Sequence, residues 1–176
     1  MGSHRPWPRP TVFRPRPRPR RRRRRTSYAA SAAAVAACAV TGALAGGPPQ
    51  EWYRSLDTPT WQPPAKTFPA VWTPLYASIA WAAGRALETC EPVHRRGLAV
   101  SLGVNLALNG GWTWLFFRLR SPLAGALGAL LLDASNADLV RRTARCDRKA
   151  AVVLVPYAAW CAFATVLSAE IARRNR

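Results

Sequence analysis

The sequence predicts an all-α membrane protein, a bundle of five transmembrane helices preceded by a disordered tail rich in Arg and Pro. Five segments are mostly apolar over about 20 residues, the length that spans a bilayer as a helix. The second, third and fifth segments lack the charged face that a helix on the surface of a soluble protein shows. The net charge of +18 is concentrated near the N-terminus, away from the apolar segments.

The tail, residues 1–26, holds 11 arginines and no acidic residue. Alternating Arg and Pro favour an extended, polyproline-like chain, and so polar a segment cannot bury a core. A basic run of this kind attracts anionic lipid headgroups or nucleic-acid phosphates. Because an apolar segment follows at once, we favour a role in membrane orientation over nucleic-acid binding.

The rest of the chain, residues 27–176, forms one predicted transmembrane domain. Its five spans are expected at residues 28–47, 68–87, 97–117, 122–140 and 150–171. The first span, taken alone, is also consistent with a cleaved secretory signal peptide, because it is short, rich in Ala and preceded by arginines. The four spans that follow favour a retained helix.

The basic residues of the loops predict the orientation. With the N-terminus in the cytoplasm, 19 basic residues fall inside and 7 outside, and most of the difference comes from the tail. Basic residues are enriched on the cytoplasmic side of membrane proteins. We therefore expect a cytoplasmic N-terminus and an external C-terminus. The high Arg and Ala content favours a bacterial plasma membrane.

The cysteines give no metal signature. None is paired at CxxC spacing, and the two histidines are far apart, whereas a zinc site needs about four clustered ligands. Three of the four fall within or beside apolar segments, so we expect buried, unreactive thiols at Cys38, Cys90, Cys146 and Cys161. No histidine lies in a span, which disfavours the usual ligation of haem iron.

Aromatic and amide side chains recur at helical spacing on three spans. If these stripes face one another, they line a pocket with flat apolar walls and a few hydrogen-bond donors, which suits a planar ligand with polar edges. Alternatively, the asparagines join neighbouring helices and the aromatic residues anchor the interface. The stripes consist of Trp72 and Tyr76, of Asn105, Asn109 and Trp112, and of Tyr157, Trp160 and Ala164.

A further polar patch lies on the fourth span. Asp133 and Asn136 are three residues apart and therefore share a helix face. Charged residues inside a membrane are costly and usually turn toward a partner. We expect Asp133 either to pair with a basic residue or to lie near the interface, without a catalytic role.

Four motifs, in order along the chain, resemble those of the TspO/MBR family, which comprises the tryptophan-rich sensory proteins and the mitochondrial translocator proteins, also called the peripheral-type benzodiazepine receptor family. They are "WYRSLDTPTWQPP", "FPAVWTPLY", "NLALNGGWTWLFF" and "PYAAWCAFATVLS". The similarity runs from about Trp52 to Asn175. It implies a five-helix membrane bundle, often dimeric, that binds tetrapyrroles such as protoporphyrin IX.

The resemblance also implies roles for individual residues. Trp72 stacks on the ligand, Asn105 and Asn109 make polar contacts, and Trp160 forms the opposite wall. The loop between the first two spans is implied to be a lid that closes over the pocket. Prolines suit such a lid because they remove backbone donors and lower the entropy lost on closing. The lid residues are Trp52, Trp61, Pro63 and Pro64.

The function implied by the resemblance is that of a membrane tetrapyrrole-binding protein that acts as sensor, regulator or transporter. Protoporphyrin IX or haem is the expected ligand, no cofactor is required, and the expected partners are the lipid bilayer and a second copy in a homodimer. Two alternatives stay open: a light-dependent porphyrin-degrading enzyme, or a structural membrane partner whose tail binds anionic lipid or nucleic acid. The sequence shows no acid/base pair or nucleophile arrangement that would support ordinary catalysis.

Overall fold

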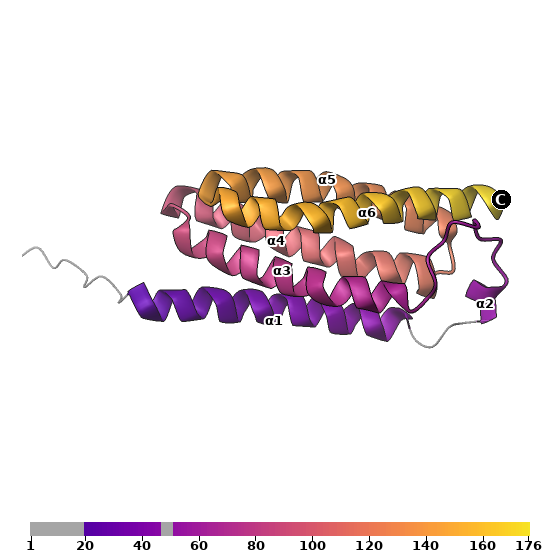
Figure 1. Ribbon diagram of the computed structural model, residues 1–176, viewed down its shortest axis with the longest axis horizontal. Helices are drawn as coiled ribbons and strands as arrows, with labels where there is room; N and C mark the ends of the chain where they lie inside the picture. Colours follow the sequence, from indigo (N-terminus) through magenta and orange to yellow (C-terminus); the bar gives the residue numbers. More distant parts are fainter. Residues whose placement is uncertain (1–19, 47–50) are drawn as a thin grey trace, which may run out of the picture.

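The computed structural model describes residues 20–46 and 51–176 of the chain. Five long helices run side by side along its long axis (Figure 1). A short helix, α2 (Glu51–Arg54), and a π-helix, η1 (Trp114–Arg118), lie at the end of the bundle that also holds the C-terminus. The long helices are α1 (Arg20–Gly46), α3 (Thr67–Thr89), α4 (Pro92–Thr113), α5 (Pro122–Cys146) and α6 (Arg148–Arg174).

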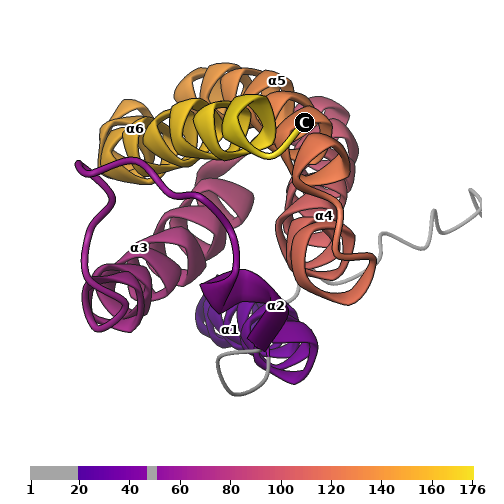
Figure 2. The same cartoon turned by 90° about the vertical axis from the view of Figure 1, so that its right-hand side faces the viewer.

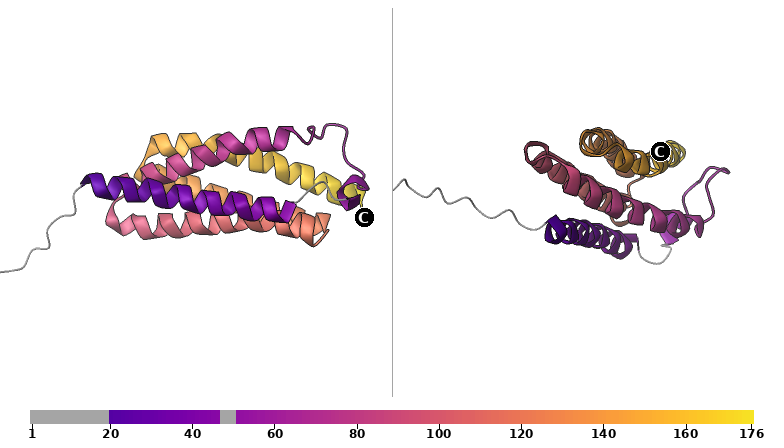
Figure 3. Two further views of the ribbon diagram at one scale, coloured as in Figure 1. Left: turned by 90° about the horizontal axis from the view of Figure 1, so that it is seen from below. Right: turned by 60° about the vertical axis from the view of Figure 1, so that its left-hand side comes forward.

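The long helices form a closed ring when the bundle is viewed along its axis (Figure 2). In order around the ring, α1 packs against α3, α3 against α6, α6 against α5, α5 against α4, and α4 against α1. The two views of Figure 3 show α1 lying along α4 on one side and along α3 on the other. Helices that are distant in sequence, such as α3 and α6, therefore face each other directly.

The segment that contains α2 crosses one end of this ring. It joins α1 to α3 and passes near the C-terminal end of α6 (Figures 1 and 2). The expected span boundaries agree with the helices to within a few residues at most ends. Three exceptions are the start of α1 at Arg20, the start of α4 at Pro92 and the end of α5 at Cys146, where residues 28, 97 and 140 were expected.

Local chemistry sets several helix ends. Ser121 and Asp147 each accept a hydrogen bond from the backbone N–H three residues later, at 3.2 and 2.9 Å, and so cap α5 and α6. Pro92 and Pro122 occupy the first position of α4 and α5, where a missing N–H costs nothing. Arg120 adopts a positive φ of 50° in the tight turn between η1 and α5.

Large apolar side chains fill the interior of the bundle and also lie on its outer surface. The interior side chains include Ile79, Leu98 and Leu154, which are fully buried. An outer surface this apolar is unusual for a soluble monomer and is typical of a surface that faces lipid. The exposed apolar residues include Val100 and Val104 on α4, Leu127, Leu130 and Leu131 on α5, and Val152, Val155 and Val166 on α6.

Three of the described helices are long and apolar enough to cross a membrane, over Thr26–Ala45, Pro122–Cys146 and Arg148–Arg174. With 23 and 22 residues, α3 and α4 also have the necessary length. Their aromatic, amide and basic residues lower their mean hydropathy. The all-helical class is confirmed, and three helices qualify as spans by length and composition.

Most of the expected disordered tail, residues 1–19, lies outside the described residues. Residues 20–26 belong to α1, so the first helix starts within the run of arginines and not after it. The boundary between tail and domain at residue 26 stays a prediction.

The expectation of four free thiols is wrong for two of them. Cys90 and Cys146 form a disulfide across 56 residues, whereas Cys38 and Cys161 are free and buried. The cause is topological, because the α3–α4 and α5–α6 turns meet at the same end of the bundle. Two further contacts mark this meeting: Arg85 pairs with Asp147 at 2.8 Å, and the Thr89 hydroxyl donates to the Cys146 carbonyl at 3.3 Å.

Candidate functional site

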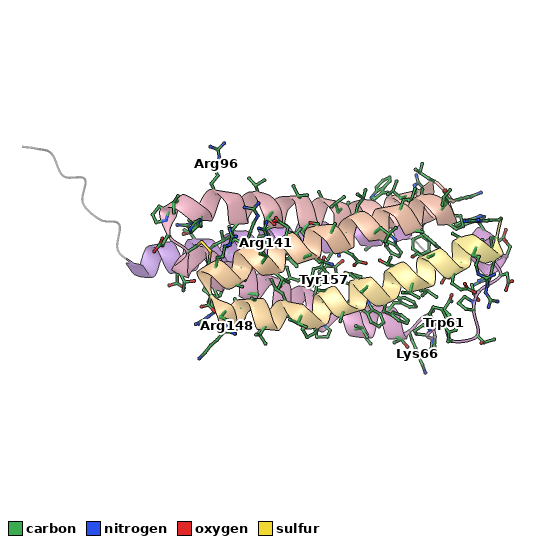
Figure 4. All side chains as sticks on the ribbon, turned by 90° about the horizontal axis from the view of Figure 1, so that it is seen from above. Trp61, Lys66, Arg96, Arg141, Arg148 and Tyr157 are labelled. Atoms are coloured by element: carbon green, nitrogen blue, oxygen red, sulfur yellow. A yellow bond between two sulfur atoms is a disulfide. The ribbon has the colours of Figure 1, made fainter. Side chains whose placement is uncertain are left out.

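A buried hydrogen-bond network joins four helices in the middle of the bundle. Its centre is the hydroxyl of Tyr157, which donates to Asn105 Oδ1 at 2.9 Å and accepts from Asn109 Nδ2 at 3.1 Å. Tyr76 donates to Asn109 Oδ1 at 3.1 Å. Asn105 Nδ2 donates to Asn136 Oδ1 at 2.7 Å. Figure 4 shows Tyr157 about midway along the bundle.

The two asparagines therefore hold helices together in this structure. Asn105 has no exposed surface and Asn109 has 4%, and the oxygen and nitrogen of each side-chain amide have protein partners. From α1, the Cys38 thiol also donates to Asn109 Oδ1, at 3.4 Å. This is the helix-joining role that intramembrane amides often have. A ligand that contacts these amides has to replace one of those bonds.

Two aromatic stacks face each other across α3 and α6. On α3, Trp72 stacks on Tyr76 with ring centroids 5.2 Å apart and planes inclined by 28°. On α6, Trp160 stacks on Phe163 with the same separation and inclination. The edge of Trp72 meets Tyr157 at 6.2 Å, and Phe68 meets Trp160 at 6.0 Å. The sequence predicts that such rings form the flat apolar walls of a ligand pocket, and this role stays a prediction.

The segment that the resemblance implies to be a lid, residues 51–66 and here called the lid, crosses the end of the bundle beside these stacks. Trp61 rests edge-on against Phe163, with centroids 5.9 Å apart, although 46% of its surface stays exposed. Gln62 Nε2 donates to the Tyr53 hydroxyl at 3.1 Å, and burial raises the pKa of this phenol. The lid therefore contacts the bundle through Trp61 and is stabilised by a hydrogen bond within its own segment.

The expected lid prolines differ in their burial. Pro63 is half-buried and Pro64 is exposed. The Pro64 carbonyl accepts from the Thr67 N–H at 2.8 Å, in the turn that leads into α3. Pro59, which the sequence did not single out, is the buried proline of the lid.

Trp112 belongs to a second aromatic cluster at the same end. It stacks on Phe116 of η1 with centroids 5.6 Å apart, and Phe116 also meets Trp52 of α2 at 5.9 Å. The sequence placed Trp112 with the two asparagines on one face of α4, and its ring packs on Phe116 in a cluster that also includes Phe163; a ligand role for Trp112 stays a prediction. Trp52 therefore contacts η1, within an apolar cluster that also includes Phe68 and Phe163.

Several buried polar atoms near these rings have no hydrogen-bond partner among the described residues. The indole N–H groups of Trp112 and Trp160 are two of them, and Asp133 Oδ1 and Asn136 Nδ2 are two more. Buried polar atoms normally have partners, so such a group marks a place where a polar ligand atom or water would be accommodated. The two indole groups are donors that can meet the edge of a ligand.

Asp133 pairs with a hydroxyl and not with a basic residue. Thr165 of α6 donates to Asp133 Oδ2 at 2.6 Å, and Asp133 is half-buried against that helix. Of the two alternatives for Asp133, the basic partner is not found among the described residues, and the position near the interface stays a prediction. Ala164, which precedes Thr165 on α6, is half-buried, as a small residue at a helix contact would be.

Sequence reasoning missed Phe68 and Phe163, whose rings both contact Trp160. A signal was present, since Phe68 precedes Trp72 by four residues and Phe163 follows Trp160 by three. The contact of Cys38 with Asn109 had no such signal, because it depends on how α1 packs against α4. A surface groove of about 550 Å³ lies between α4 and α5, away from these aromatic stacks.

Comparison with known proteins gives consistent results. Residues 30–174 match the model of the TspO/MBR family. The "Tryptophan-rich protein TspO" of Chlorobaculum tepidum is 34% identical over 79% of this chain and 89% of its own length. The "Tryptophan-rich sensory protein" of Cereibacter sphaeroides is 34% identical over 79% and 85%. The human "Translocator protein" is 29% identical over 78% and 83%.

Proposed function

Because the chain belongs to the TspO/MBR family of membrane proteins, we propose that it binds a tetrapyrrole between α3 and α6 and acts as a porphyrin sensor, regulator or transporter. Protoporphyrin IX is the proposed ligand. In this proposal all five long helices span the bilayer, with the N-terminus in the cytoplasm and the lid and C-terminus outside.

The observation that carries the proposal is the environment of Trp160. Its ring is stacked on Phe163, meets Phe68 edge-on, and keeps a buried N–H without a partner. A wide, flat, apolar molecule with polar edges satisfies both features, because it can stack on the rings and accept from the indole. Trp72 and Tyr76 supply a second flat surface on the facing helix.

The proposal also gives a role to Trp61 of the lid. Trp61 leans on Phe163, the partner of Trp160 in its stack, so movement of Trp61 uncovers the α6 side of the site. A ligand that enters from this end has to displace Trp61 first. The proposed roles are therefore stacking for Trp72, Tyr76 and Trp160, hydrogen-bond donation for the two unpaired indoles, and gating for Trp61.

The experiment is a titration of the purified full chain with protoporphyrin IX, followed by the absorbance of the porphyrin itself. This readout is chosen because removing tryptophans would alter a fluorescence signal from the protein. We expect Trp72→Phe combined with Trp160→Phe to weaken binding roughly three- to tenfold, the value of one or two aromatic contacts. Haem, titrated in parallel, tests whether the metal-free ligand is preferred.

The matched control is Trp81→Phe. Trp81 lies nine residues after Trp72 on the same helix, is 41% exposed and contacts Arg85 instead of the stacks. Its substitution should leave the affinity unchanged. Equal affinity in the double variant and in the wild type would contradict the proposed site, and loss of porphyrin absorbance on illumination would instead indicate light-dependent degradation.

A further inference from the structure

The groove between α4 and α5 lies outside the proposed porphyrin site. It has a volume of about 550 Å³ and runs along the outer face of the bundle. It lies toward the end opposite the lid, where Figure 4 shows Arg96 and Arg141, far from Trp61 and Lys66. The lining residues are Val93, Arg96, Gly97, Val100, Ser101 and Val104 of α4, and Ser135, Asp138 and Arg142 of α5.

One end of the groove is basic. Arg96 is exposed and has no ion pair or hydrogen bond to the described part of the chain. Arg142 lies across Gly97, where an added Cβ would come within 2.8 Å of its Nη1. Two guanidinium groups from different helices therefore border the same end of the groove.

The acidic residue of the groove does not cancel this charge. Both oxygens of Asp138 are in use: Oδ1 accepts from Arg141, and Oδ2 accepts from Ser101 and from Arg142 Nε, each at 2.7 Å. Three arginines, Arg96, Arg141 and Arg142, are therefore only partly balanced by the single carboxylate of Asp138, so this end of the groove keeps a positive charge. Only the Nε of Arg142 is used in its bond with Asp138, so its terminal nitrogens keep donor capacity for an anion.

The other end of the groove is apolar. Val100 and Val104 are 58% and 49% exposed, and the neighbouring outer surface of α5 carries exposed leucines. Arg96 and Val104 are eight residues apart on α4, which places them about 12 Å apart along the helix axis. A basic end followed by an apolar channel of this length matches a phosphate headgroup followed by an acyl chain.

We propose that the groove binds one anionic glycerophospholipid, with its phosphate at Arg96 and Arg142 and an acyl chain along Val100 and Val104. Charge complementarity selects this occupant, because Arg96 has no ion-pair or hydrogen-bond partner in the described part of the chain and a guanidinium pairs well with phosphate. The apolar half excludes a free inorganic anion as the full occupant. Ser135 also accepts from Asn105 Nδ2 at 3.3 Å, so the bound lipid touches the edge of the internal network.

The test is native mass spectrometry of the purified full chain in mixed micelles that contain equal amounts of dioleoylphosphatidylglycerol and dioleoylphosphatidylcholine. We expect the wild type to retain one phosphatidylglycerol in preference to phosphatidylcholine. Arg96→Gln should lower its affinity for phosphatidylglycerol roughly fivefold, the value of one basic residue at a lipid surface. Val100→Trp should lower it at least as much by filling the apolar channel.

The matched control is Arg145→Gln. Arg145 lies on α5 near the same end, is exposed, and does not line the groove. The basic tail is present in every variant, so any phosphatidylglycerol that it binds adds the same amount to each measurement. Thermal unfolding of each variant shows whether it is folded. Arg96 is chosen because its replacement breaks no hydrogen bond or ion pair within residues 20–46 and 51–176.

Four outcomes would overturn the proposal. They are an absence of preference for phosphatidylglycerol, an equal loss in Arg145→Gln, displacement of the lipid by inorganic phosphate, and unchanged binding in Val100→Trp. If Val100→Trp instead converts a dimer to a monomer without affecting lipid retention, the groove is an interface between two copies. None of these results depends on porphyrin binding, so the two proposals fail separately.

Discussion

The side-chain amide of Asn175 pairs with the backbone of Asp57 through two hydrogen bonds. The Asp57 N–H donates to Asn175 Oδ1 and Asn175 Nδ2 donates to the Asp57 carbonyl, both at 2.9 Å. A longer ion pair of 3.5 Å joins Arg174 to the Asp57 carboxylate. The middle of the lid is therefore fastened to the last turn of α6, 118 residues further along the chain.

The first prediction concerns this fastening. Asn175→Ala removes both hydrogen bonds, which are exposed and are together worth about 1–2 kcal/mol. We expect the lid to open more often and trypsin to cut faster after Arg54 and Lys66, the exposed basic residues near its two ends. The time course of cleavage on a gel measures this. Arg176→Ala, at the exposed C-terminal residue, is the control, and equal rates in both variants would contradict the fastening.

The second prediction concerns the lid tryptophan. Trp61→Ala removes the ring that leans on Phe163, and we expect bound protoporphyrin IX to dissociate severalfold faster while the unfolding midpoint stays nearly constant. Stopped-flow displacement of the porphyrin measures the rate. Trp81→Ala removes a ring of similar exposure at a distance from the lid. A dissociation rate that changes equally in both variants would refute the gating role.

The third prediction concerns the role of Asn105 in joining neighbouring helices. Asn105→Leu leaves the Tyr157 hydroxyl without its acceptor and Asn136 Oδ1 without its donor. We expect the bundle to lose about 1–2 kcal/mol of stability, since each interhelical bond of this kind contributes near 1 kcal/mol. Unfolding in a detergent mixture of increasing denaturing strength measures the loss. Ala107→Leu, on the exposed face of α4, should leave stability unchanged.

Most of the fold follows from patterns that the sequence displays. Long apolar segments separated by short polar loops were enough to locate the five long helices, because helix length and composition are local properties. The Trp72–Tyr76 stack was also predictable, since residues four apart share a helix face. The partners on other helices were not. The hydrogen bond from Cys38 to Asn109 and the disulfide between Cys90 and Cys146 both join helices that are distant in sequence. These contacts depend on the order of the helices around the ring.

The ring contacts of Trp112 could not be predicted for a similar reason. Helical spacing correctly put it on the same face as Asn109, but three residues of α-helix carry a side chain about 4.5 Å along the axis. At the end of α4 this distance moves the ring from the central network to the cluster around Phe116, whose position in η1 the sequence did not indicate. A shared helix face therefore predicts the direction of a side chain better than it predicts which rings that side chain contacts.

The fourth prediction concerns the disulfide. The denatured, unreduced chain should take up two iodoacetamide labels, at Cys38 and Cys161, and four after reduction. Mass spectrometry counts them. Cys90→Ser should take up three labels without reductant, because it frees Cys146, and should lower stability by about 2–4 kcal/mol. Four labels in the unreduced wild type would exclude the bond in the isolated protein.

The fifth prediction concerns the contact of α5 with η1. A Cβ added to Gly125 would overlap the ring of Phe116, which is itself only 3% exposed and cannot move outward. Gly125→Ala should therefore cost about 1–3 kcal/mol, the usual penalty for overpacking a tight contact. Gly103→Ala is the control, because nothing lies within 4 Å of its added Cβ. Phe116→Leu combined with Gly125→Ala should recover part of the loss, since the smaller side chain frees the space that the new methyl group occupies. If the double variant is as unstable as the sum of the two single variants, the penalty comes from the backbone of Gly125 and not from the ring.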